Sequence, residues 1–165
     1  MSATIINLAD YRSRNYPESA RSLYDRASAI DESDPVSAIP LYERSLELDP
    51  LFGLSWTNLG NCHFRTGSHE AKWCYLKALA CDPTQPEALY NLGYLSLERG
   101  DHAHAIKMFR LSLESDPRFA DTHFNLALAL DRVGKRFEAK RHWLAYTRLG
   151  DNDYYLELAR NNLND

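Results

Sequence analysis

Residues 89–117 read LYNLGYLSLERGDHAHAIKMFRLSLESDP, and this stretch decides the fold. Leu89, Leu92 and Gly93 fall on one stripe of an α-helix, and Ala105 and Phe109 begin a similar stripe on the segment that follows. Two amphipathic helices in succession bury their apolar stripes against each other. The stretch therefore predicts a helical hairpin, in which the small residues Gly93 and Ala105 let the two backbones approach and the neighbouring aromatic fills the remaining space.

The same pattern recurs four times along the chain, with a period of 33 or 34 residues. Its first mark is a small residue, at Ala27, Gly60, Gly93 and Ala127. Its second mark is an alanine followed four residues later by an aromatic, in the pairs Ala38 and Tyr42, Ala71 and Tyr75, Ala105 and Phe109, and Ala139 and Trp143. The first three units end in Asp-Pro, which stops one helix before the next begins. A period of this length predicts a stacked array of helical hairpins.

The recurring residues resemble the tetratricopeptide repeat, a 34-residue helix-turn-helix with the signature W-x2-L-G-x2-Y, A-x3-F, P. The residues that carry the resemblance are Trp56-x-x-Leu59-Gly60, Leu89-x-x-Leu92-Gly93 and His123-x-x-Leu126-Ala127, each with its following alanine and aromatic. The resemblance implies an all-α fold, a right-handed superhelical solenoid of antiparallel helix hairpins. It covers roughly residues 19–150.

The expected organisation is an N-terminal tail, four repeats and a capping helix, at residues 1–18, about 19–51, 52–84, 85–118 and 119–150, and 151–165. Gly100 and Gly134 are expected to end first helices, because glycine accepts left-handed dihedral angles. Pro40 should delay or bend the second helix of the first repeat. The first two units are one residue short between their helices, which predicts a tighter turn there.

Composition agrees with one domain that buries a substantial core: 165 residues, 44% hydrophobic and 25% charged. We find neither an apolar run of membrane-spanning length nor a secretory signal at the start, which favours a cytoplasmic protein without membrane contact. The cysteines Cys62, Cys74 and Cys81 are odd in number and form no C-x-x-C. We interpret them as buried apolar groups rather than disulfide or metal ligands.

Motifs for catalysis are missing from the sequence, which contains no phosphate loop and no nucleophile elbow. We therefore expect no enzyme activity and no cofactor. His102 and His104 cannot both face one side of a helix as an i, i+4 pair would, so no metal site is expected. A basic end is formed by Lys135, Arg136, Lys140 and Arg141, on a chain of net charge −4. We interpret it as a solvated helix face, with an acidic protein or nucleic acid as the less favoured alternative.

In the family that the chain resembles, the first helix of each hairpin lines a concave groove that holds a peptide of another protein. The residues predicted to line that groove here are Tyr24, Asn58, Asn61, Arg65, Tyr90, Asn91, Tyr94, Phe124 and Asn125. Asn58, Asn91 and Asn125 hold equivalent positions, so stacking would bring them into a row whose carboxamides pair with a bound backbone. The alternative is that these asparagines bond neighbouring helices of the scaffold. Exposed aromatics would anchor the peptide.

Some members of the family grip the terminal carboxylate of heat-shock chaperones with lysines and arginines on successive first helices. Here Glu87 and Asp121 stand on that face. A terminal carboxylate would meet acidic neighbours, so this mode of binding is not expected.

The sequence thus favours an adaptor that binds a peptide segment of another protein. One alternative is a chaperone similar to the class II chaperones of type III secretion, which are of similar length. Another is a scaffold that assembles into a homo-oligomer through its N-terminal tail. For the tail we hypothesise that Ile5, Ile6 and Leu8 dock on a repeat surface of the same or a neighbouring chain.

Overall fold

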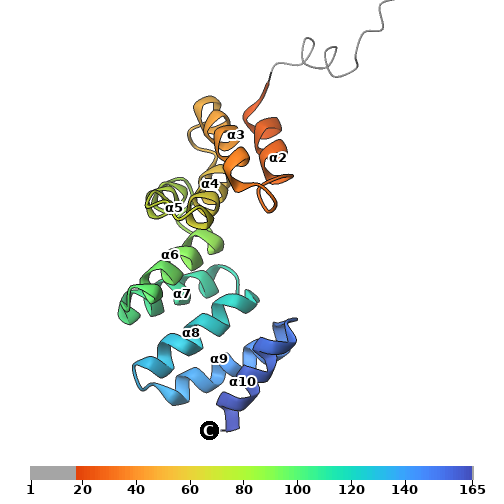
Figure 1. The fold of residues 1–165 in the computed structure, drawn as a ribbon. Coiled ribbons are helices and arrows are strands. Elements are labelled where there is room, and N and C mark those ends of the chain that lie inside the picture. Colours follow the sequence, from red (N-terminus) through yellow and green to blue (C-terminus); the bar gives the residue numbers. More distant parts are fainter. Residues whose placement is uncertain (1–17, 165) are drawn as a thin grey trace, which may run out of the picture. The chain divides into compact units, whose positions relative to one another are not determined.

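The computed structural model describes residues 18–164, the last of them by its backbone alone. Within that range all regular secondary structure is α-helical (Figure 1). The helices are α2 (Ala20–Ser28), α3 (Pro35–Leu48), α4 (Gly53–Arg65), α5 (Ala71–Cys81), α6 (Pro86–Glu98), α7 (His102–Ser115), α8 (Ala120–Arg132), α9 (Arg136–Leu149) and α10 (Asp153–Asn164). The predicted all-α fold is confirmed. Ile5, Ile6 and Leu8, predicted to dock on a repeat surface, lie outside the described residues.

The chain divides into two compact units, one up to residue 71 and one from residue 72 onward. The first unit contains α2, α3 and α4, and the second contains nearly all of α5 and the helices after it. This division falls inside the second predicted repeat. The repeat boundaries and the right-handed superhelical course of the whole array stay predictions.

In the first unit α3 packs between α2 and α4. The small Ala27 and the aromatic Tyr42 are both fully buried, as the hairpin pattern predicts. The Ser45 hydroxyl donates to the backbone oxygen of Ala20 at 2.8 Å and lies 2.9 Å from the Ser55 hydroxyl. Because these buried oxygens satisfy one another, polar side chains are tolerated where the three helices meet.

Two expectations about the first repeats are wrong, the late start of the second helix and the tighter turns, whereas a bend at Pro40 stays a prediction. Helix α3 does not begin late at Pro40: it starts at Pro35, because the Asp34 side chain caps it by accepting from the backbone N–H of Ser37 at 3.1 Å. The turns of the short units are not tighter either. Connections 29–34 and 66–70 are longer than 99–101 and 133–135, and α2 and α5, with 9 and 11 residues, are shorter than their counterparts α6 and α7.

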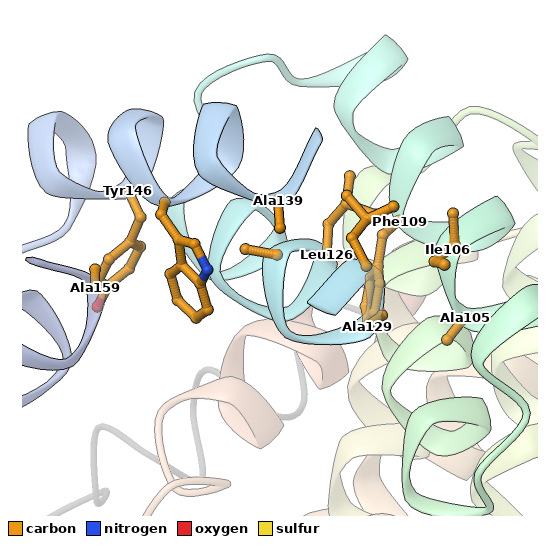
Figure 2. Close-up of a cluster of buried hydrophobic side chains, with 11 residues drawn as sticks. Ala105, Ile106, Phe109, Leu126, Ala129, Ala139, Tyr146 and Ala159 are labelled. Atoms are coloured by element: carbon orange, nitrogen blue, oxygen red, sulfur yellow. The ribbon is translucent and has the colours of Figure 1, made fainter. Parts of the chain in front are cut away.

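In the second unit α6 packs on α7, α7 on α8, α8 on α9 and α9 on α10. Figure 2 shows the apolar cluster of its last four helices, with Ile106 and Phe109 toward one end and Tyr146 and Ala159 at the other. Gly100 and Gly134, predicted to end first helices, both have φ of +76°, so that expectation is confirmed. Gly93 lies against the Phe109 ring, which fills the crossing point as predicted.

The buried aromatics of the first and last hairpins are fixed at their polar tips in the same way. Tyr42 donates its hydroxyl hydrogen to the Asp31 carboxylate. Trp143 donates its indole N–H to the Asp131 carboxylate at 2.8 Å. Asp31 follows α2, and Asp131 lies in the last turn of α8. Each aromatic therefore joins the two helices of its hairpin by a hydrogen bond as well as by packing.

The cysteines are free thiols, with Cys62 and Cys74 buried and Cys81 partly exposed. Burial raises the pKa of Cys62 to about 11, so this thiol stays protonated at neutral pH and behaves as an apolar group.

Candidate functional site

One hollow in the second unit gathers residues from α6, α8, α9 and α10, and its volume is about 390 Å³. We call it the aromatic hollow. It is lined by Tyr90, Tyr94, Asp121, Phe124, Asn125, Leu128, Tyr146 and Tyr155. Four of the predicted groove residues, Tyr90, Tyr94, Phe124 and Asn125, thus lie together.

The rings of the aromatic hollow are held in place by aromatic neighbours. The Phe124 ring stands edge-on to three others, with centroid distances of 5.1 Å to Trp143, 5.1 Å to Tyr146 and 5.0 Å to Tyr155. The Tyr90 ring lies 5.9 Å from that of Phe109, a fully buried residue of the core. Because the rings pack on the core, the surface they form is preorganised, and a ligand has little conformational entropy to remove from it.

Asn125 is only 8% exposed, and its amide nitrogen is committed to the scaffold. Nδ2 donates to the Tyr90 hydroxyl at 3.0 Å and to the backbone oxygen of Asp121 at 3.1 Å. A carboxamide has two N–H donors, so both are used. What Asn125 retains for a ligand is the acceptor Oδ1.

Negative charge dominates the electrostatics of the aromatic hollow. Partial burial, together with the nearby Asp151, raises the pKa of the Asp121 carboxyl above its ordinary value. Burial is also the main cause that raises the pKa of Tyr90, with the charge of Asp121 second. Tyr90 is therefore neutral at physiological pH, and Asp121 is the one acidic or basic residue among the lining residues.

In the first unit, Asn58 and Arg65 form hydrogen bonds within the scaffold. Asn58 donates from Nδ2 to the hydroxyls of Tyr42 at 3.0 Å and Tyr24 at 3.4 Å. Arg65 donates to the backbone oxygens of Asp31 and Glu32, and so holds the connection between α2 and α3. For Asn58 and Asn125 the structure thus favours the alternative in which asparagine bonds neighbouring helices.

The remaining predicted residues lie on first helices of their hairpins. Asn61 on α4 and Asn91 on α6 are both half-buried. Asn91 and Asn125 belong to one unit and Asn58 to the other. The row of three asparagines stays a prediction.

Two residues of the aromatic hollow, Tyr146 and Tyr155, were not predicted from the sequence. A signal for Tyr146 exists in the repeat register. The residue three positions after the hairpin aromatic is small in the first three units, at Ser45, Ala78 and Ser112, whereas the fourth has Tyr146. A Cβ on Gly150 would lie 2.6 Å from Cζ of Tyr146, so glycine lets the chain pass closely over this ring on its way to α10.

A second hollow, of about 460 Å³, involves α7 and the connection between α8 and α9. Its charged residues include Lys107, Arg110 and Lys135, so the predicted basic end contributes to it through Lys135. Arg110 forms an ion pair with Glu138. Within residues 18–164, no cluster of histidine, cysteine, aspartate and glutamate suited to a metal ion is found, and none of the helices has the length and apolarity needed to cross a membrane.

Comparison with known proteins gives the same family twice. Family models described as tetratricopeptide repeat match residues 28–72 and 74–107. Among solved structures, the fold is similar to that of YrrB, a TPR protein with an unusual peptide-binding site, with a TM-score of 0.74 and 20% identity over 95% of this chain and 80% of that one. It is also similar to MamA, with a TM-score of 0.70 and 19% identity over 88% of this chain and 95% of that one.

Three curated relatives share parts of their sequences with this chain. The general transcriptional corepressor ssn6 of Schizosaccharomyces pombe is 35% identical over 50% of this chain and 8% of its own length. The human protein O-mannosyl-transferase TMTC3 is 28% identical over 88% and 17%. The tetratricopeptide repeat-containing protein trd-1 of Caenorhabditis elegans is 26% identical over 73% and 16%. The chain therefore spans less than a fifth of the length of each of these relatives.

Proposed function

Because the chain belongs to the tetratricopeptide repeat family, we propose that it is a non-enzymatic adaptor and that the aromatic hollow binds a peptide segment of a partner protein. The observation that carries the proposal is the convergence of five aromatic side chains from four helices on one hollow, with the Tyr90 and Phe124 rings fixed by packing on the core. Aromatic residues held in this way are typical anchors of protein interfaces.

A comparison of free energies indicates that the aromatic rings supply most of the binding. Micromolar affinity requires about 8 kcal/mol. A hydrogen bond contributes about 1 kcal/mol net, and the donors of Asn58 and Asn125 are already used within the scaffold. A row of asparagines would therefore contribute little, and burial of the partner's side chains against the rings must supply the main part.

The comparisons support this proposal only at the level of the family. YrrB has a peptide-binding site, which supports peptide binding by this type of fold. The transferase named in TMTC3 is not carried over, since the match covers 17% of that protein. A chaperone of the type III secretion kind, self-assembly through the tail and a cytoplasmic location remain predictions without a specific observation in their favour.

The proposal is tested by affinity capture with the full chain from the native host, followed by mapping of the captured partner with overlapping peptides. The site variant combines Tyr94→Ala and Tyr155→Ala, which remove two exposed or half-exposed rings of the aromatic hollow. The matched control is Phe137→Ala, which removes a 92% exposed ring from α9 outside the hollow.

We expect the mapped peptide to bind the wild type and the Phe137→Ala control equally, and the site variant at least about tenfold more weakly, because interface aromatics are frequent hot spots. Circular dichroism and thermal unfolding check that α6 to α9, which carry the other rings of the aromatic hollow, stay folded in all three proteins. Retention of the same peptide by the site variant would place the binding surface elsewhere.

A further inference from the structure

The aromatic hollow carries a second inference, which rests on the proposed function and names the chemistry of the peptide. We propose that the hollow accepts a cationic side chain, an arginine or a lysine, of the bound peptide, with Asp121 as its counter-ion. Three features carry this inference: the aromatic walls, the single carboxylate, and the type of hydrogen-bonding group that the hollow presents.

The walls of the hollow suit a cation. Tyr90 and Tyr94 come from α6, Phe124 from α8, Tyr146 from α9 and Tyr155 from α10. The face of an aromatic ring carries negative potential and attracts an ammonium or guanidinium group placed over it. A guanidinium group is planar and weakly hydrated, so it also stacks on rings that would not accept a strongly hydrated ion.

Charge distinguishes a cation from the other possible occupants. Asp121 is the only charged residue among the lining side chains, and no lysine or arginine is among them. An acidic side chain or a terminal carboxylate would be repelled by Asp121. An apolar side chain would cover the Asp121 carboxylate and leave it without a partner, which is unfavourable for a desolvated charge. A cationic side chain contacts the rings and pairs with the carboxylate at once.

Asn125 suits a ligand that donates hydrogen bonds. Both N–H groups of Asn125 are used, toward Tyr90 and the backbone oxygen of Asp121, so Asn125 offers Oδ1 as an acceptor. Guanidinium and ammonium groups have donors and no acceptor. The raised pKa of Asp121 agrees as well: partial burial and, after it, Asp151 disfavour its ionised form, and a cation beside it would favour that form.

The test begins with a displayed library of random dodecapeptides, selected in parallel on the full wild-type chain and on the Tyr94→Ala, Tyr155→Ala variant. We expect a class of peptides that binds the wild type, is lost on the variant and shares an arginine or lysine at one aligned position. If the peptides that are lost on the variant share no basic residue, the proposed cationic ligand is wrong, while the adaptor function is unaffected. If all selected peptides bind the wild type and the variant equally, the aromatic hollow is not the binding site.

A selected peptide is then compared with a copy in which citrulline replaces the shared arginine, or norleucine the shared lysine. Each substitute keeps approximately the length of the side chain and removes its charge. Isothermal titration calorimetry should show about tenfold weaker binding of the neutral copy to the wild type. Asp121→Asn should reduce that ratio to below about threefold, whereas Asp121→Glu, which keeps the charge, should retain most of it.

The matched control is Glu114→Gln, which removes one negative charge from the second hollow on α7. It should leave the tenfold ratio unchanged, because the charge it removes does not line the aromatic hollow. An equal loss with Glu114→Gln and Asp121→Asn would show that only the net charge of the protein matters and would overturn the assignment of Asp121.

Discussion

Gly93 sets the distance between α6 and α7 through the absence of a single methyl group. A Cβ at this position would lie 2.7 Å from Cδ1 and Cε1 of Phe109, and that ring is fully buried. Alanine is the better helix former by about 1 kcal/mol. Overpacking a rigid core costs about 1–3 kcal/mol, and the Phe109 ring is fully buried, so it can move only by displacing its neighbours. We therefore expect Gly93→Ala to lower the free energy of unfolding in urea by up to about 2 kcal/mol, the overpacking cost less the helix gain.

A double-mutant cycle separates this contact from other effects of the substitution. Phe109→Leu removes the ring atoms that the new methyl group would meet, so Gly93→Ala should cost less in that background. The expected coupling energy is at least about 0.5 kcal/mol. Equal costs in both backgrounds would show that the Phe109 ring is not the obstacle.

Single residues also mark where prediction from sequence succeeds and where it stops. Gly93 and Phe109 were predictable as a packed pair, because each lies on the apolar stripe that its helix buries against the other helix of the hairpin. The scaffold role of Asn58 and Asn125 was not, because it depends on tyrosine hydroxyls contributed by other helices. The sequence left two alternatives for these amides, and only the position of Tyr24, Tyr42 and Tyr90 decides between them.

At the scale of helices, two histidines connect α8 with α9. Nδ1 of His123 lies 2.9 Å from Nδ1 of His142, and Nε2 of His123 lies 3.0 Å from the backbone oxygen of Pro117. Since Nε2 must donate to that oxygen, a neutral His123 accepts at Nδ1, and His142 donates its Nδ1–H. If both rings were protonated, two donors would face each other and the hydrogen bond would be lost.

This contact makes the stability of the second unit depend on pH. Burial, and after it the charge of His123, lowers the pKa of His142 from 6.5 to about 4 in the folded protein. Between pH 6.5 and 4 the unfolded chain binds more protons at this residue than the folded one, so stability falls as the pH falls through that window. With allowance for partial exposure of the ring, we expect a loss of about 1–2 kcal/mol from pH 7 to pH 4.

The variant His142→Gln keeps an N–H donor toward His123 and cannot titrate. The free energy of unfolding is measured in urea at pH 7 and at pH 4 for both proteins. The value for the wild type minus that for the variant should be smaller at pH 4 than at pH 7. His69→Gln, at an exposed histidine, controls for the loss of one histidine. A wild-type-minus-variant difference that stays constant from pH 7 to pH 4 would contradict the assignment to His142.

At the scale of the whole molecule, the repeat period specifies the hairpins but not the aromatic hollow. Small and aromatic residues at fixed spacing predict four hairpins, and those residues are buried where the spacing predicts. The hollow depends on Tyr146 and Tyr155, of which one departs from the repeat register and the other belongs to a helix outside the repeats. The repeat period does not determine how α10 packs on α9.

The same neighbour-by-neighbour packing predicts how the second unit opens. Helix α10 packs on α9, whereas α7 and α8 each have packed helices on both sides. In a repeat protein stability is approximately a sum of hairpin and nearest-neighbour terms, so the element with fewest neighbours opens first.

We expect native-state hydrogen exchange to give amides of α10 at least about tenfold less protection than those of α7 and α8. Because Tyr155 joins α10 to Phe124, Tyr155→Ala should lower the protection of α10 further and leave α7 unchanged. Equal protection in all these helices would instead show a single global opening and would contradict the prediction.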